Sequence, residues 1–314
     1  MSESYPIEAV NLCKHFGDFV ALDNLNLQVK KNSFTGLLGP NGAGKSTTLK
    51  IFGHLHKATS GNAYINGYDV EKETKQALTG VGSLIETPEF YQYMTPVETF
   101  AFIGDILGMK KEAISAETDE ILEKVKMKEW ADKRLGTFSK GMRQRISLGL
   151  TLLNDPEVII LDEPTSGLDP RGMAETREIL KNLRTENNGL TILMSSHLMY
   201  EVSDLCDRIA IVDHGQLLVH DDMYSLIGNP DHRTLIIKTK DVPDADMIAS
   251  IEGLPNISLA ELSGNDIRIQ MKGGMDEQTE LFKQIAELGI GVYSMSEKEN
   301  ALEERYLELI KSSR

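Results

Sequence analysis

The sequence predicts an α/β protein with a helical insertion, followed by a small α+β domain. Three observations lead to this prediction. Short apolar runs alternate with longer helical patterns as far as about residue 220, and a helical stretch interrupts them between residues 97 and 132. The pattern changes again after about residue 222. The chain has 314 residues, which is enough for two domains of ordinary size.

Four apolar runs indicate strands of the α/β core. A strand that is apolar at every position suits a sheet covered on both faces, as parallel sheets are when helices pack against them. We therefore expect a parallel sheet buried between helices. The four runs are Phe34–Leu38, Val158–Leu161, Thr191–Met194 and Ile209–Val212.

The segment between the first two of these strands has the periodicity of helices. Apolar residues recur at helical spacing from Val97 to Leu107 and again from Ile121 to Val125. We expect two or three helices here, as an insertion into the core over about residues 90–150.

The chain beyond residue 222 predicts a second, smaller domain. It contains a linker-like cluster rich in Gly, Asn, Pro and Asp, and then strand-like runs alternate with helices. We therefore divide the chain into residues 1–222 and 223–314, and expect the second part to be an α+β domain of the split βαβ type. Its elements are strands at 234–239, 267–271 and 291–295, helices from Asp244 and over Asp276–Leu288, and a last amphipathic helix with Leu302, Tyr306, Leu307 and Ile310.

The charge balance argues against several classes of function. Lys and Arg number 33 and Asp and Glu number 48, which gives a net charge of −15. This excess of acidic side chains opposes a general affinity for nucleic acid or anionic lipid. No apolar run reaches the roughly 18 residues of a membrane span, so we expect any membrane role to come through a partner.

A phosphate-binding loop is the first chemical signal. It matches the pattern G-x-x-x-x-G-K-[ST] between a predicted strand and a predicted helix, where backbone N–H groups and the helix N-terminus attract phosphate. In this pattern the lysine reaches the β- and γ-phosphates and the hydroxyl after it ligates Mg²⁺. The plainer alternative is a flexible glycine-rich turn. The nine residues are Gly39, Pro40, Asn41, Gly42, Ala43, Gly44, Lys45, Ser46 and Thr47.

Two carboxylates after a buried strand are the second signal. Asp162 and Glu163 follow Val158–Leu161, so we expect them at the carboxyl edge of a parallel sheet, where ligands bind. There Asp162 would hold Mg²⁺ through water, and Glu163 would polarise the water that attacks phosphate. Taken alone, such residues are more often a solvated strand end, and the phosphate-binding loop upstream favours the catalytic interpretation.

Three further motifs complete a family resemblance. FSKGMRQR (138–145) precedes this strand, EPTSGLDP (163–170) continues from it, and LMSSH (193–197) follows. With the phosphate-binding loop, they make residues 5–220 resemble the nucleotide-binding subunit of an ATP-binding-cassette (ABC) transporter. The resemblance implies a P-loop ABC ATPase core with a mixed sheet, ATP and Mg²⁺ as cofactors, and a homodimer or cassette heterodimer formed head to tail around ATP.

The resemblance also implies roles for single residues. Ser139 and Gly141 would contact the γ-phosphate held by the opposite subunit, and Asp169 would lie in the loop that links the two sites. His197 would bind the γ-phosphate and hold the attacking water with Glu163. Phe16 would stack on adenine. The alternatives are a structural histidine at position 197 and a core aromatic at position 16.

The sequence departs from the family pattern at two places. The signature motif is usually Leu-Ser-Gly-Gly-Gln, and here Lys140 and Met142 replace its third and fifth residues. Glu86 stands where the family has a glutamine for Mg²⁺, so the resemblance implies that Glu86 ligates the metal with Ser46 and Asp162. The run SLIETPEFYQYMTPVETF resembles subunits of exporters for bacitracin and lantibiotic self-protection and related multidrug exporters.

The resulting hypothesis is an ATPase subunit that powers a separate membrane permease of an exporter. We expect it in the cytoplasm, on the inner face of the cell membrane through the permease. Two cysteines and an N-terminus without the features of a signal peptide agree with this location. The alternative is an ABC-type regulatory ATPase that is not coupled to transport. A cassette ATPase acting on DNA or the ribosome is disfavoured by the acidic charge, and we expect no nucleic-acid partner.

Overall fold

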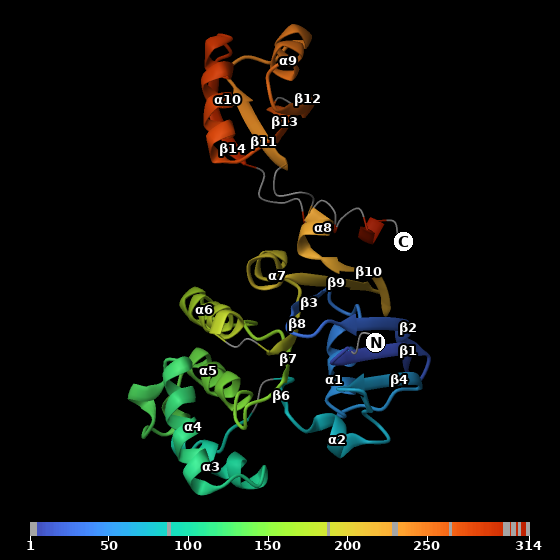
Figure 1. The fold of residues 1–314 in the computed structure, drawn as a ribbon, viewed down its shortest axis with the longest axis vertical. Helices are drawn as coiled ribbons and strands as arrows, with labels where there is room; N and C mark the ends of the chain where they lie inside the picture. Colours follow the sequence, from blue (N-terminus) through green and yellow to red (C-terminus); the bar gives the residue numbers. More distant parts are fainter. Residues whose placement is uncertain are drawn as a thin grey trace. The chain divides into compact units, whose positions relative to one another are not determined.

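The computed structural model describes residues 5–86, 89–186, 189–227, 232–263 and 266–297, together with residues 302, 306 and 309–311. The chain divides into two compact units. The first is Met1–Met223 with Leu309–Arg314, and the second is Tyr224–Glu308. Figure 1 shows the course of the chain through both units, and each unit is described by itself.

A six-stranded sheet forms the centre of the first unit, and it confirms the predicted α/β core. Five of its strands, β6, β7, β8, β3 and β9, run parallel to one another, and β10 pairs antiparallel with β9. All residues of β3, β8 and β9 are buried, as their apolar sequences predict. In sheet order the strands are β10 (Gln216–Asp222), β9 (Arg208–Asp213), β3 (Phe34–Leu38), β8 (Thr191–Ser196), β7 (Val158–Asp162) and β6 (Val81–Leu84).

A second, antiparallel sheet was not predicted from the sequence. It contains β2 (Phe19–Val29), β1 (Ile7–Phe16), β4 (Ser60–Ile65) and β5 (Tyr68–Asp69) in that order. The pairing of β1 with β2 shifts register three times between Ala9 and His15, so polar and apolar residues do not alternate regularly along the strand. Without that alternation the strand signal is weak.

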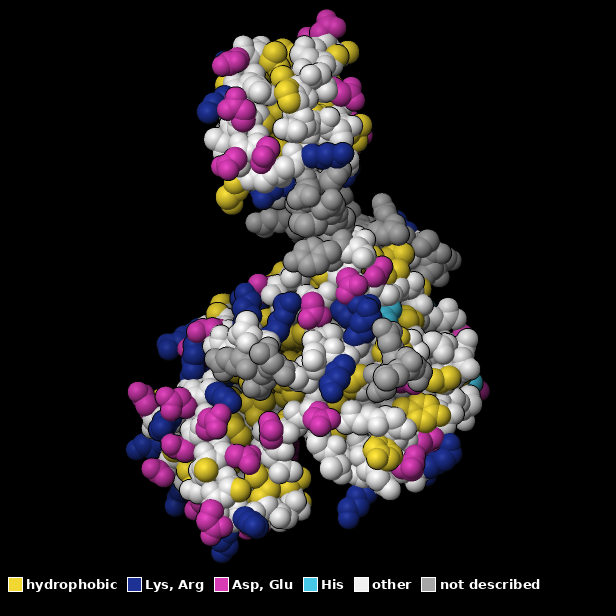
Figure 2. All heavy atoms as spheres, in the orientation of Figure 1, with side chains coloured by type: hydrophobic (Ala, Val, Ile, Leu, Met, Phe, Trp, Pro, Cys, Tyr) yellow, Lys and Arg dark blue, Asp and Glu magenta, His cyan; other side chains and the backbone are white. Residues whose placement is uncertain are grey.

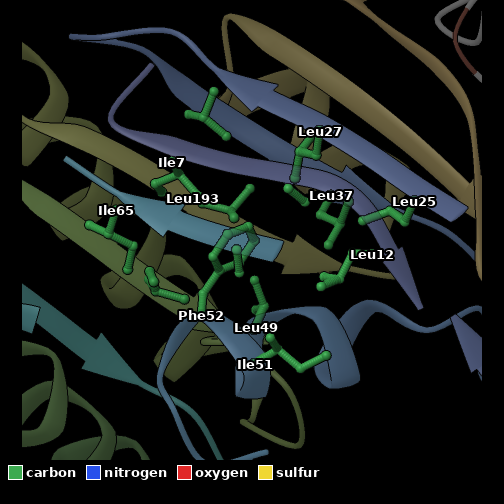
Figure 3. Close-up of a cluster of buried hydrophobic side chains, with 14 of the residues drawn as sticks. Ile7, Leu12, Leu25, Leu27, Leu37, Leu49, Ile51, Phe52, Ile65 and Leu193 are labelled. Carbon is green, nitrogen blue, oxygen red and sulfur yellow. The ribbon is translucent and has the colours of Figure 1, made fainter. Parts of the chain in front are cut away.

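The core of the first unit lies between the two sheets, around helix α1 (Lys45–Phe52). Figure 3 shows Leu49, Ile51 and Phe52 of this helix among leucine and isoleucine side chains from both sheets. Phe52 and Leu49 are fully buried. This packing fixes the helix whose first turn follows the phosphate-binding loop.

The helical insertion is present as predicted. Helix α3 begins at a capping box in which Thr95 and Glu98 each bond the other's backbone N–H, and Pro96 occupies the first turn. The helices of the first unit after α1 are α2 (Thr74–Leu78), α3 (Pro96–Ile106), α4 (Lys111–Lys124), α5 (Lys140–Leu150), α6 (Pro170–Glu186) and α7 (Met199–Leu205), with 3-10 turns η1 (Lys128–Trp130) and η2 (Leu135–Thr137).

The second unit is an α+β domain whose strands are all antiparallel to their neighbours, in the order β12-β13-β11-β14. This order, with helices after the first and third strands, is the split βαβ arrangement. Helix α8 (Met223–Ile227) leads into β11 (His232–Thr239), α9 (Ala245–Glu252), β12 (Ile257–Ser263), β13 (Asp266–Lys272), α10 (Met275–Glu287) and β14 (Val292–Glu297). Strand β12 was not predicted.

The predicted last helix lies partly outside the described residues. Residues 302, 306 and 309–311 are helical, and Leu307 is not among the described positions. Within the described ranges, no helix has both the length and the apolarity of a bilayer span.

Candidate active site

The phosphate-binding loop joins β3 to α1, and its glycines are required by the backbone. Gly44 has φ +105, and a Cβ there would lie 2.7 Å from the carbonyl oxygen of Ala21. A Cβ at Gly39 would lie 2.2 Å from the carbonyl oxygen of Val212. A side chain at either position would collide with backbone. The glycines therefore let the loop pack closely before the N-terminus of α1, where a phosphate would bind.

Lys45 lies across this loop. Its Nζ donates to the carbonyl oxygens of Gly39, at 2.8 Å, and Pro40, at 3.1 Å. Burial lowers the pKa of the ammonium group, and the negative charges of Glu163 and Asp162 oppose that shift. The lysine is thus a buried cation close to two carboxylates, and phosphate oxygens would supply further negative charge to it.

Two hydroxyl groups converge on one oxygen of Asp162. Ser46 Oγ donates to Asp162 Oδ1 at 3.0 Å, and Ser195 Oγ donates to the same atom at 2.5 Å. The hydroxyl of Ser46 and the carboxylate are hard oxygen ligands of the kind that Mg²⁺ prefers. Mg²⁺ on a nucleotide keeps waters and phosphate oxygens as its other ligands, so these two groups fit the metal without a larger protein cluster.

Glu163 and His197 are brought together at the ends of neighbouring strands. Glu163 Oε1 lies 3.1 Å from His197 Nδ1. Glu163 has φ +44, an uncommon conformation for a residue with a side chain. Its backbone N–H, which lies 3.0 Å from Ser195 Oγ and 3.2 Å from Ser195 O, helps to hold this conformation. A carboxylate beside an imidazole can orient water and accept its proton.

Ser195 is a site residue that the sequence analysis missed. Its hydroxyl is buried and touches both Asp162 and the backbone of Glu163. It therefore connects the two carboxylate residues. The only signal for it in the sequence is its place in the run LMSSH, two residues before His197.

Phe16 lies at the end of β1 and is 45% exposed, so it is not a core aromatic. The His56 ring meets it edge-on, with centroids 5.6 Å apart, and the Lys14 ammonium lies 4.7 Å from its centroid. An exposed ring held in this way can stack on a base. Its role toward adenine stays a prediction.

Glu86 has a different partner in the structure from the one expected. It follows β6 with φ +68, and its carboxylate forms an ion pair with Lys50 of α1. This bond lowers the pKa of the carboxyl group below its ordinary value, so it is ionised at neutral pH. Ser46, which was expected to ligate the metal together with Glu86, donates a hydrogen bond to Asp162. Metal ligation by Glu86 stays a prediction, and Lys50 is a partner that the sequence analysis missed.

Ser139, Gly141 and Asp169 line a hollow of about 780 Å³ that none of the described phosphate-loop residues lines. Ser139 caps α5, since its Oγ accepts a hydrogen bond from the N–H of Met142 at 3.2 Å. Asp169 caps α6 by accepting from the N–H of Gly172 at 3.1 Å. These residues form a second group, separate from the cluster of Lys45, Ser46, Asp162, Glu163 and His197.

Comparison with known proteins agrees with this site. The family model described as "ABC transporter" matches residues 22–166. The chain is 35% identical to the bacitracin transport ATP-binding protein BcrA of Bacillus licheniformis, over 97% of each chain. It is 32% identical to the linearmycin resistance ATP-binding protein LnrL of Bacillus subtilis, over 96% of this chain and 97% of LnrL. It is 36% identical to the lantibiotic transport ATP-binding protein SrtF of Streptococcus pyogenes, over 67% of this chain and 87% of SrtF.

Solved structures of similar fold are ATP-binding cassettes. An ATP-binding subunit of an ABC transporter has a TM-score of 0.63 at 25% identity, and covers 70% of this chain and 91% of its own. A dimeric cassette, MJ0796, bound to ADP and Pi after hydrolysis, has a TM-score of 0.61 at 26% identity, and covers 69% and 98%.

The fold, the phosphate-binding loop and the paired carboxylates define a nucleotide-hydrolysing cassette ATPase. The chain belongs to the ATP-binding subunits of ABC transporters, a family that binds and hydrolyses ATP. Among its relatives are the bacitracin and lantibiotic transport ATP-binding proteins.

Proposed function

We propose that this chain is the ATP-hydrolysing subunit of an exporter and powers a separate membrane permease that carries antibiotic, peptide or drug-like substrates. The names of BcrA, LnrL and SrtF, which refer to transport of or resistance to such compounds, support the substrate class. In this proposal the chain lies on the cytoplasmic face of the membrane and is held there by the permease.

The observation that carries the permease proposal is an exposed apolar surface on the helical insertion. Six apolar or aromatic side chains in and beside α3 are between 41% and 68% exposed, and the Tyr91 ring contacts those of Tyr93 and Phe102. Figure 2 shows hydrophobic side chains among charged ones over this region. Exposed aromatic and apolar side chains gathered on one segment are typical of a docking site. We define this docking surface as Tyr91, Tyr93, Val97, Phe102, Ile106 and Leu107.

In the proposed mechanism, water attacks the γ-phosphate in line with the leaving ADP. Lys45 binds the β- and γ-phosphates, and Ser46 and Asp162 would hold Mg²⁺, which supplies charge neutralisation when bound. Glu163 orients the water and takes its proton, while His197 holds Glu163 and reaches the γ-phosphate. Positioning and electrostatic stabilisation account for the rate.

The proposal includes a head-to-tail dimer. Ser139 and Gly141 of one copy would meet the nucleotide on the phosphate loop of the other, and Asp169 would lie between the two sites. The separation of the two groups within one chain supports this arrangement, because head-to-tail pairing of two copies would bring the two groups together. Cassettes of the family form dimers, as in the MJ0796 structure.

A binding experiment tests the permease proposal. The chain, carrying an affinity tag, is expressed with the membrane protein encoded beside it and purified in mild detergent. We expect the two to copurify, and Tyr93→Ser with Phe102→Ser to reduce recovery of the membrane protein by about tenfold or more. Tyr68→Ser is the matched control, because Tyr68 is also exposed but lies on β5, outside the docking surface. An active ATPase that binds no membrane protein would favour the regulatory alternative.

A further inference from the structure

Helix α5 and the loop after Glu163 are joined by two side chains. Gln144 Nε2 donates to the carbonyl oxygen of Pro164 at 2.7 Å, and Lys140 Nζ donates to that of Ser166 at 3.2 Å. The two side chains are four residues apart and share one face of the helix. They reach carbonyl groups two residues apart on the segment 163–169, which we name the catalytic loop.

The bond from Lys140 leads directly to Glu163. Ser166, whose carbonyl accepts from Lys140, donates its own N–H to the carbonyl oxygen of Glu163 at 3.0 Å. The lysine therefore holds the turn that begins at Glu163. That residue has φ +44, so its conformation needs support from its surroundings.

Gly167 makes room for this contact. It has φ +67, and a Cβ there would lie 2.3 Å from Lys140 Nζ. The ammonium group thus occupies the place of a side chain at this position. A cation in the first turn of a helix interacts unfavourably with the positive end of the helix dipole. The first turn of α5 holds no acidic residue that would offset this interaction. The carbonyl of Ser166 supplies negative partial charge that offsets this cost.

We infer that Lys140 is a positioning residue, which fixes the catalytic loop so that the Glu163 carboxylate faces His197 in the reactive geometry. The inference rests on the proposed role of Glu163. Because Ser139 is the neighbour of Lys140 at the start of α5, contact of Ser139 with the nucleotide of a second copy would act on Glu163 through the same lysine. The lysine in place of the usual glycine is therefore a functional element of this chain.

The test compares Lys140→Met, which removes the donor, with Lys140→Arg, which keeps a cationic donor. We expect Lys140→Met to lower kcat for ATP hydrolysis about fivefold to tenfold with KM for ATP within about twofold, and Lys140→Arg to restore kcat to within about threefold. Lys181→Met is the matched control, because Lys181 of α6 is half-exposed and pairs with Asp204, outside both the hollow and the catalytic loop. It should leave both constants unchanged.

Two results would overturn the inference. A wild-type kcat in Lys140→Met would mean that the bond to Ser166 has no effect on Glu163. A raised KM with unchanged kcat would mean that Lys140 binds the nucleotide itself. If Lys140→Met unfolds at a lower temperature than wild type, Lys140→Ala gives the same comparison, because alanine also removes the donor and has the higher helix propensity. Failure of the proposed role of Glu163 is a separate outcome, since Glu163→Gln would then hydrolyse ATP at the wild-type rate.

Discussion

The two units of this protein use their sheets in different ways. In the first unit, the parallel strands β3, β7 and β8 all end at one edge of the sheet, and the segments after them carry the phosphate loop, the carboxylates and His197. In the second unit every strand is antiparallel to its neighbour in the sheet, so the carboxyl ends of neighbouring strands lie at opposite edges. A parallel sheet concentrates functional groups at one edge, as the Lys45–Asp162–Glu163 cluster shows.

The known proteins differ in how much of this chain they cover. The solved cassettes cover about 70% of this chain, whereas BcrA and LnrL align over nearly all of it. BcrA and LnrL therefore align with the second unit as well as with the first. We expect the second unit to modulate the ATPase activity or the permease, and ATP binding and hydrolysis to depend on the first unit alone.

The largest expected effect is that of Lys45→Ala in the first unit. Removing this buried cation leaves the phosphates without their main charge partner, so ATP affinity should fall by about a hundredfold or more. Equilibrium binding of a fluorescent ATP analogue measures it. Lys238→Ala, an exposed lysine of the second unit, is the control and should bind as wild type does. Equal loss in both variants would contradict the assignment of the nucleotide site to the first unit.

Glu163→Gln should separate binding from hydrolysis. The amide keeps the shape of the side chain but cannot take a proton from water, so we expect hydrolysis to slow by about a hundredfold or more while MgATP still binds. Size-exclusion chromatography with ATP should then show a trapped dimer. Glu261→Gln on β12 of the second unit is the control. Unchanged turnover in Glu163→Gln would remove Glu163 from the catalytic role.

A smaller and more specific effect is expected at Glu86. If its carboxylate ligates Mg²⁺, Glu86→Gln should keep MgATP affinity within about tenfold but raise the Mg²⁺ concentration for half-maximal ATPase severalfold. Lys50→Met should act in the opposite direction, because it frees the carboxylate from its ion pair. Titration of Mg²⁺ at fixed ATP compares the three proteins. Coincident curves would mean that Glu86 does not reach the metal.

The smallest effect on the chemistry should follow removal of the second unit. A chain that ends after Met223 should remain folded and bind ATP with an affinity within about threefold of the full chain, because the nucleotide site lies in the first unit. Its unfolding midpoint should fall by a few degrees, since the truncation also removes the buried Ile310. Loss of soluble, ATP-binding protein would show that the two parts share a core.

The sequence was most informative where function or burial restricts the choice of residues. The apolar strands and the helical insertion follow from local patterns, and the structure confirms them. The antiparallel sheet escaped prediction because bulges interrupt β1 and one face of its strands is partly exposed. Strand β12 was missed for the same reason, as its register shifts between Ile257 and Leu259.

By itself, the sequence determined the phosphate-binding loop, the acidic strand end and the order of the motifs, because each is a pattern of neighbouring residues. Only the tertiary structure decided which groups meet. Ser46 and Asp162 are 116 positions apart, and their contact depends on the order and register of strands β3, β8 and β7. The contacts of Ser195 with Asp162, Lys50 with Glu86 and Lys140 with Ser166 have the same origin. Side chains that are distant in sequence find their partners through packing, which leaves no periodic signal along the chain.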